Sequence, residues 1–212
     1  MNKPRVLLAD DHRLVAEALK SLLADEFELV GIVEDGRTMV KAARELRPDV
    51  IVADISMPLL NGIDALGQLK QHDPGVRVVF LTMHRDAAYA RRALEAGAAG
   101  FVLKHSASAE LVLAVRAALQ GRTYVTPDLA AELMLASKQD ARHQADPVAG
   151  LTPRQREILQ LFAEGKSAKE IGAVLSLSAR TVEDHKYRLM ESLGIENSTE
   201  LIRFAIKHGL IP

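Results

Sequence analysis

The N-terminal half of the chain carries five polar residues that could do chemistry together, each at or just after the end of a short apolar run. The residues are Asp10, Asp11, Asp54, Thr82 and Lys104. Three converging carboxylates repel one another unless a cation joins them, and oxygen ligands with open coordination positions suit Mg²⁺ or a similar hard ion such as Mn²⁺. A carboxylate can also attack phosphorus and form an aspartyl phosphate. The pattern predicts phosphoryl chemistry at a cation site, if the fold brings these residues together.

Short apolar runs alternate with amphipathic segments through the first 120 residues. The runs are rich in Val, Ile, Leu and Phe, which is typical of strands buried on both faces of a parallel sheet. Five strands alternating with five helices predict a doubly wound α/β fold, in which a 2-1-3-4-5 strand order makes strands one, three, four and five neighbours. Ligands of such sheets bind at the carboxyl ends of the strands, where the five polar residues would converge. The expected strands are 6–9, 29–33, 50–53, 76–81 and 100–103, and the expected helices lie near 13–24, 37–46, 63–71, 86–96 and 108–119.

Asp54, at the end of the third run, is the candidate nucleophile of this site. A cation would neutralise the incoming phosphoryl oxygens, and Lys104 would pair with one of them. The Thr82 hydroxyl could donate to another oxygen once the phosphoryl group is present, which would move the loop after strand four. Any one of these residues alone is more simply a solvated strand-end residue. All five together, on the correct strand ends of one fold, favour a functional site.

Residues 5–120 resemble the receiver domain of bacterial response regulators. The motifs that carry the resemblance are Asp10-Asp11, Asp54-Ile-Ser-Met-Pro58 with Asn61-Gly62, Leu81-Thr82, and Phe101-Val-Leu-Lys104. The resemblance implies that Asp54 accepts phosphate from a sensor histidine kinase. It also implies that Asp11, Asp54 and the main-chain carbonyl of Ser56 bind the metal, and that Asp10 helps through water. Thr82 and Phe101 match the switch pair.

Three positions near this site need separate comment. Phe101 stands where receivers often have Tyr, so its switch would lack a hydroxyl, and His105 stands where many have Pro, so the loop after Lys104 is less constrained. Neither departure touches the phosphorylation chemistry. His12 directly follows the acidic pair. A histidine at the start of a helix is more often a surface residue than a metal ligand, and we expect a surface residue here.

The last 60 residues read as four helices with marked starts. Thr152-Pro153-Arg-Gln155 and Ser167-Ala-Lys-Glu170 are capping boxes, Asn197-Ser-Thr-Glu200 is an Asn-capped version, and Ser178 can cap the helix between them. The segments 167–175 and 178–193 have the form of a scaffold helix and a recognition helix, which is the arrangement of a helix-turn-helix that reads DNA. The polar candidates for DNA contact on these helices are Lys166, Lys169, Arg180, Thr181, Glu183, Asp184, Lys186, Tyr187 and Arg188.

Charge alone does not decide whether this helical part binds DNA or protein. Residues 150–212 hold nine Lys and Arg against eight Asp and Glu, so the strongly basic footprint of many DNA-binding domains is missing. The motifs add the decisive signal, because residues 151–194 resemble the LuxR-type helix-turn-helix. They are Leu151-Thr-Pro-Arg-Gln-Arg-Glu157, Glu164-Gly-Lys166, Lys169-Glu-Ile171, Thr181-Val-Glu-Asp-His185 and Leu193-Gly194. With a receiver in front, the chain is similar to the NarL/FixJ response regulators.

The LuxR-type resemblance also implies roles for individual residues. Glu183, Asp184 and Tyr187 match positions that face base edges, and Thr181, Lys186 and Lys166 match contacts to the DNA backbone. Carboxylates can accept from cytosine N4 and also repel phosphates. The resemblance further implies a dimer contact on the last helix, whose apolar residues are Leu201, Ile202, Ala205 and Ile206, although packing on the domain's own core is an equally good interpretation of these four.

The composition of the 212 residues fits this reading. The chain has 48% apolar residues, a net charge of −1 and no Cys, which excludes a disordered tail, a disulfide scaffold and a cysteine-based metal site. It shows no membrane span and no signal peptide, so we expect a cytoplasmic protein. We expect a receiver over 1–120, a linker over 121–149 with a short helix near 127–135, and the helix-turn-helix over 150–212.

The resulting hypothesis is a regulator that is not an enzyme acting on a separate substrate. Phosphorylation of Asp54 by a sensor kinase would favour a homodimer that binds double-stranded promoter DNA. Slow autodephosphorylation is compatible with this role. The main alternative is a DNA-binding regulator that acts without phosphorylation, with a receiver that only dimerises. A phosphohydrolase is a poorer fit, because haloacid-dehalogenase-like enzymes need Asp-x-Asp after the first strand, whereas Asp10 and Asp11 are adjacent.

Overall fold

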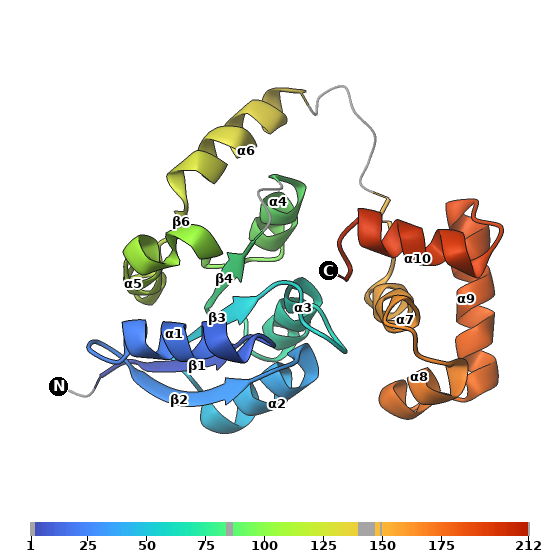
Figure 1. Ribbon diagram of the computed structural model, residues 1–212, viewed down its shortest axis with the longest axis horizontal. Coiled ribbons are helices and arrows are strands. Elements are labelled where there is room, and N and C mark those ends of the chain that lie inside the picture. The colour runs from blue at the N-terminus through green and yellow to red at the C-terminus, as the bar shows by residue number, and fades with distance from the viewer. Residues whose placement is uncertain (1–2, 84–86, 140–146, 149, 212) are drawn as a thin grey trace. The chain divides into compact units, whose positions relative to one another are not determined.

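The computed structural model describes residues 3–83, 87–139, 147–148 and 150–211. By its internal contacts the chain divides into two compact units, one of residues 1–57 and 62–143 and one of residues 58–61 and 144–212. Figure 1 shows the first unit as strands with surrounding helices and the second as helices. The linker predicted over 121–149 includes residues 140–146 and 149, which lie outside the described residues.

The first unit is a doubly wound α/β fold, as the alternating pattern predicts. Its strands are β1 (Arg5–Ala9), β2 (Glu28–Val33), β3 (Val50–Asp54), β4 (Val78–Thr82) and β5 (Gly100–Leu103). Its helices are α1 (Arg13–Leu23), α2 (Gly36–Leu46), α3 (Gly62–His72), α4 (Ala87–Glu95) and α5 (Ala107–Leu119). All pairings are parallel, and the order β2-β1-β3-β4-β5 confirms the prediction.

A sixth strand, which the sequence pattern does not predict, extends the sheet. β6 (Tyr124–Val125) pairs in parallel with β5, placing Phe101 opposite Val125. Thr126 follows β6 and precedes α6 (Pro127–Gln139). The Thr126 hydroxyl donates to Glu110 Oε2 at 2.7 Å and accepts from the Leu103 N–H at 3.3 Å. The side chain therefore ties β6 to β5 and α5.

The sheet core explains why the polar residues gather at the strand ends. Alternate strand residues such as Val52 and Leu81 point to one face, where α1 and α5 add Leu19 and Leu111, and all four are buried. Strand interiors filled with aliphatic side chains leave only the strand ends and loops for polar groups. Gly62 begins α3 close to this edge, and a Cβ there would lie 2.5 Å from the Asp54 carbonyl oxygen. Only glycine lets α3 start this near β3 without displacing the backbone.

The second unit is built from four helices, as predicted. They are α7 (Pro153–Ala163), α8 (Ala168–Leu175), α9 (Ala179–Leu193) and α10 (Ser198–Lys207). The structure confirms the helix starts: Thr152 and Ser167 form complete capping boxes, and the side chains of Ser178 and Asn197 each accept a main-chain N–H of the first turn. The buried core includes Ile158, Leu161, Ile171, Leu175, Val182, Leu189 and Leu201.

The turn between α8 and α9 is tight and depends on two small residues. Ser176 adopts the left-handed conformation with φ 56°, where a glycine would be free of strain. Gly172 lies under the turn, since a Cβ there would be 2.6 Å from the Leu177 carbonyl oxygen. The backbone of α8 therefore packs directly against the backbone of the turn, which fixes the position at which α9 starts.

Candidate functional site

The sheet brings the predicted acidic residues together at one edge. Asp54 ends β3, while Asp10 and Asp11 follow β1, its direct neighbour in the sheet. Single side-chain ligand atoms of Asp10, Asp11, His12 and Asp54 all lie within 4.8 Å of one another. Asp10 and Asp54 are almost fully buried, with 1% and 5% of their surface exposed. Buried carboxylates this close need cationic neighbours.

Lys104, which follows β5, supplies one such cation. Its Nζ lies 2.6 Å from Asp54 Oδ2 and 2.8 Å from Asp10 Oδ2, and only 7% of its side chain is exposed. Burial raises the pKa of Asp54 above its ordinary value, although the charge of Lys104 acts in the opposite direction. Burial would lower the pKa of Lys104, but the carboxylates of Asp54 and Asp10 outweigh it and raise that pKa. Lys104 therefore stays charged at neutral pH and bridges the two acids.

Lys104 leaves part of the acidic group unmatched. Asp11 Oδ1 is a buried atom that accepts no aligned hydrogen bond within the described residues, whereas Asp10 Oδ2 has the Lys104 ammonium 2.8 Å away. Unmatched buried carboxylate oxygens are costly unless a cation or its water joins them. Hard oxygen donors of this kind are the ligands that Mg²⁺ and Mn²⁺ take. The residues present therefore fit a divalent cation.

Of the remaining predicted residues, Ser56 and Thr82 lie at the same edge, and Phe101 lies inside β5. The Ser56 N–H donates to Asp54 Oδ1 at 3.3 Å, so the loop after β3 curls back over the carboxylate. Thr82 ends β4 and is 2% exposed, and Phe101 in β5 is completely buried. The sheet register pairs Phe101 with Phe80. Thr82 and Phe101 thus come from the two neighbouring strands β4 and β5.

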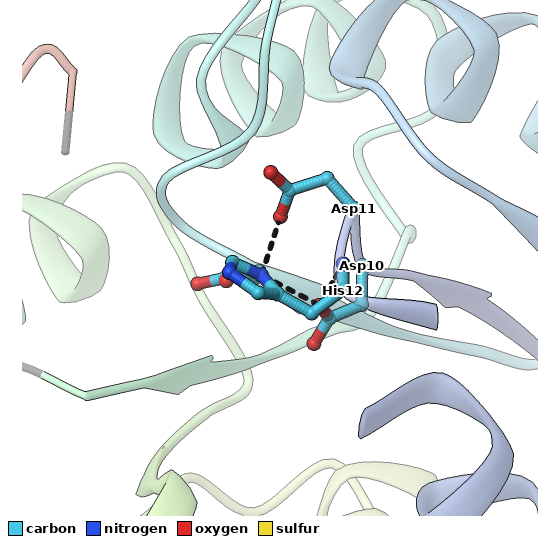
Figure 2. A group of neighbouring side chains, drawn as sticks. Asp10, Asp11 and His12 are labelled. Carbon is cyan, nitrogen blue, oxygen red and sulfur yellow. Dashed lines mark hydrogen bonds and ion pairs between the residues drawn. The ribbon is translucent and has the colours of Figure 1, made fainter. Parts of the chain in front are cut away.

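His12 is the residue of this site that sequence reasoning undervalued. It is exposed, as expected of a surface residue, yet its Nδ1 lies 2.9 Å from Asp11 Oδ1 and 3.5 Å from Asp10 Oδ1 (Figure 2). The signal was its place directly after the acidic pair. Helix starts often carry exposed histidines, so this position alone does not distinguish a ligand from a surface residue.

The second unit presents the predicted helix-turn-helix face. Lys169, Arg180, Asp184, Tyr187 and Arg188 are exposed. Tyr187 has 67% of its surface exposed although it is a large aromatic residue. A tyrosine presents an apolar ring face and a polar hydroxyl to a partner. They suit contact with bases or sugars.

Other predicted DNA contacts are partly engaged within the unit. Lys166 and Lys186 are half-buried, as are Thr181 and Glu183. Lys186 Nζ lies 5.1 Å from the centre of the Phe162 ring and 3.8 Å from Glu183 Oε2. A cation over an aromatic ring is stabilised there, so Lys186 must leave these partners before it can reach a phosphate.

Core packing and dimer contact were equally good interpretations of the four apolar residues of α10, and burial assigns two of them to the core. Leu201 and Ala205 are buried, at 1% and 0% exposure, and belong to the helical core. Their side chains attach α10 to its own domain by packing into the helical core. Ile206 is 50% exposed and Ile202 half-buried, so these two remain the candidates for contact with a partner.

Comparison with known proteins shows the family. Residues 6–116 match the family model of the response regulator receiver domain, and residues 149–205 match that of the bacterial regulatory proteins of the luxR family. The chain belongs to the NarL/FixJ response regulators. It is therefore a two-component response regulator with a DNA-binding LuxR-type domain, and not a classical enzyme.

Relatives of this response regulator match it along nearly their whole length. Response regulator GacA of Pseudomonas aeruginosa is 34% identical over 209 residues, which is 98% of this chain and 97% of GacA. The solved structure of RcsB from Salmonella typhimurium matches 98% of this chain and 99% of its own, with 30% identity and a TM-score of 0.67. A structure of an RcsB–DNA complex matches 97% of this chain and 98% of its own, with 30% identity and a TM-score of 0.60. Among the described residues of this regulator, no helix is long and apolar enough to cross a membrane.

Proposed function

We propose that Asp54 accepts a phosphoryl group from a sensor histidine kinase, and that this modification controls a homodimer which binds promoter DNA. The main support for this proposal is the ion pair of Lys104 with Asp54 and Asp10, because it places a positive charge beside a buried carboxylate. Residues 1–120 act as the receiver and 150–212 as the DNA-binding domain. The family membership supports a sensor kinase as the donor and double-stranded DNA as the target.

Each residue at the strand ends has its own role in the phosphoryl transfer. An Asp54 oxygen forms the new bond to phosphorus as the bond to the kinase histidine breaks. Lys104 exchanges its contact with Asp54 for one with a phosphoryl oxygen, and keeps Asp10 as its second partner. Asp10, Asp11, Asp54 and the Ser56 carbonyl would hold a divalent cation, which would neutralise charge at the phosphoryl oxygens. Water then attacks the phosphorus slowly, the bond between Asp54 and phosphorus breaks, and inorganic phosphate leaves. This autodephosphorylation is the only turnover we propose.

The switch follows from the neighbours of Asp54. Thr82 on β4 donates its hydroxyl to the new phosphoryl oxygen, and Phe101 on β5 repacks into the space that opens. Both states exist before phosphorylation, and the modification shifts the population toward the one that dimerises. Ile202 and Ile206 on α10 supply part of the dimer contact. A two-fold dimer reads an inverted repeat with its two α9 helices.

Binding to genomic DNA fragments, with and without the phosphoryl analogue beryllofluoride, tests the phosphorylation claim. We expect the analogue to tighten DNA binding by the full chain and to have no effect on Asp54→Asn, which cannot form the adduct. Equal affinity with and without the analogue would support the alternative, a regulator that acts without phosphorylation.

The DNA face is tested separately with Tyr187, because its exposure makes the variant structurally harmless. Tyr187→Ala should lose specific DNA binding while the helical domain and the dimer persist, and Tyr187→Phe shows whether the ring or the hydroxyl matters. Circular dichroism and sedimentation serve as the controls for fold and dimer. Unchanged binding by Tyr187→Ala would reject α9 as the groove-facing helix.

A further inference from the structure

His12 occupies a position where a side chain normally caps a helix, yet it does not. It is the N-cap residue of α1, with φ −93° and ψ 96°, and its side chain makes no capping hydrogen bond. Asp35 at the start of α2 shows the usual arrangement, because its carboxylate accepts from the Thr38 N–H. The imidazole of His12 turns instead toward the acidic residues, as Figure 2 shows.

The contact between His12 and Asp11 is close without being a hydrogen bond. Nδ1 lies 2.9 Å from Asp11 Oδ1, but that buried oxygen accepts no aligned hydrogen bond from any described residue. An imidazole nitrogen and a carboxylate oxygen at this separation can both reach one shared cation. Ligands at about 2.1 Å from a metal, and at right angles around it, lie about 3 Å apart.

His12 and Asp11 also form the part of the site that Lys104 does not serve. The ammonium of Lys104 lies against Asp54 and Asp10, which leaves Asp11 with its unmatched oxygen. A cation that enters the group therefore meets the Asp11 carboxylate and the His12 nitrogen together. With 63% of the His12 side chain exposed, its Nε2–H can face water while Nδ1 points inward.

We propose that His12 is a ligand of the divalent cation, through Nδ1, and that it gives the site a preference for Mn²⁺ over Mg²⁺. The proposal rests on the cation site of the proposed function and adds a nitrogen to its oxygen ligands. Mg²⁺ is a hard ion that takes oxygen ligands in strict octahedral geometry. Imidazole nitrogen suits the first-row transition metals, whose affinity for such a mixed set rises from Mn²⁺ onward.

Electron spin-echo spectroscopy of the full chain loaded with Mn²⁺ tests this assignment directly, because it detects nitrogen nuclei bound to the metal. The wild type should show ¹⁴N coupling of a coordinated imidazole, and labelling histidine with ¹⁵N should change it to the ¹⁵N pattern. His12→Ala should abolish the coupling. His72→Ala is the matched control, since His72 lies on α3 against Arg44 and Gln68, and it should keep the coupling intact.

Competition binding supplies the second readout. His12→Ala should weaken Mn²⁺ binding at least about tenfold, as loss of a metal-orienting residue does, and leave Mg²⁺ binding within about twofold. Wild-type Mn²⁺ spectra without histidine coupling, or equal losses for both metals, would overturn the assignment. Asp11→Asn tests the cation site itself, independently of His12. If neither metal binds the wild type, or if both metals bind Asp11→Asn as tightly as the wild type, the cation site of the proposed function is refuted. A failure confined to His12→Ala refutes only the role of His12.

Discussion

Removing Lys104 and removing Asp54 should change the stability of the receiver in opposite directions. In Lys104→Met, Asp10 and Asp54 lose the ammonium that lies 2.8 and 2.6 Å away and keep two negative charges at a buried edge. Breaking a buried ion pair by deleting one partner costs about 3–5 kcal/mol. The cost has an upper limit, since one carboxylate can take up a proton instead. At pH 7, protonating a carboxyl of ordinary pKa costs about 4 kcal/mol, because each pH unit above that pKa adds about 1.4 kcal/mol.

The expected loss for Lys104→Met is therefore about 3–4 kcal/mol at pH 7 without added metal, from the same ion-pair and protonation costs. At pH 5 the protonation route costs only about 1.5 kcal/mol, so the loss should shrink to that size. Added Mg²⁺ or Mn²⁺ should also reduce it, because a bound cation replaces part of the missing charge and stabilises the native state.

Asp54→Asn should instead stabilise the receiver at neutral pH. Because burial raises the pKa of Asp54 above 3.8, the native state holds that proton more tightly than the unfolded chain does. Stability then falls as the pH rises from 3.8 through the raised pKa, and the ionised carboxylate is a net cost above it. Asn keeps the shape and removes this cost, while Lys104 keeps Asp10 as its partner. The gain should vanish below the ordinary pKa.

Hydrogen exchange of the β1 and β3 amides in the full chain measures both variants, because it reports the opening free energy of the receiver separately from the helical domain. Lys20→Met is the control: its exposed pair with Glu17 lies on α1, at 3.3 Å, with half of the lysine side chain in solvent. Such a pair contributes less than about 1 kcal/mol. A loss for Lys104→Met as small as that of the control, or one that does not change between pH 7 and pH 5, would refute the buried-bridge reasoning.

Three further substitutions test the packing that positions the two domains' functional elements. Ser176→Gly should stabilise the helical domain by about 0.5 kcal/mol, because relief of the left-handed strain slightly exceeds the added freedom of the unfolded chain; urea denaturation that shows a loss contradicts it. Gly172→Ala should cost about 1–2 kcal/mol in the same assay, since overpacking against the Leu177 carbonyl outweighs the better helix propensity of alanine. Thr126→Val should cost about 1–3 kcal/mol by leaving the buried Leu103 N–H without its acceptor, and faster exchange of that amide checks it, whereas unchanged exchange speaks against the tie.

Features governed by local rules could be predicted from the sequence, and this includes most of the fold. The continuous apolar runs identify the parallel strands, and the residues that follow them must meet at one sheet edge, as Asp54 and Lys104 do. Helix starts were equally predictable, because Thr152 and Ser167 satisfy main-chain N–H groups only three residues away. Such features need no knowledge of distant contacts.

What the sequence did not show depends on contacts between distant residues. β6 is only two residues long, too short for any periodicity, and it is held in place by the bond from Thr126 to Glu110, 16 residues away. Lys186, in α9, has the charge of a phosphate contact, but its ammonium lies over the ring of Phe162, which belongs to α7. In both cases a contact with a residue distant in the sequence determines the structure, and local sequence patterns do not show such a contact.

The nearly balanced charge of the helical domain has a measurable consequence for DNA binding. With Lys186 held by Phe162 and Glu183, the exposed cations of the α8–α9 face are Lys169, Arg180 and Arg188. Three phosphate contacts per protomer predict that log K falls with log salt at a slope of about −3 for one protomer and about −5 for a dimer. So shallow a slope means that one protomer binds DNA weakly at physiological salt. High affinity must therefore come from a dimer, in which two protomers bind the same DNA. Titrating DNA binding of the beryllofluoride-treated chain from low to high salt checks this. A slope steeper than about −8 would show that Lys186 and further cations reach the DNA, and would remove the electrostatic reason for control by dimerisation.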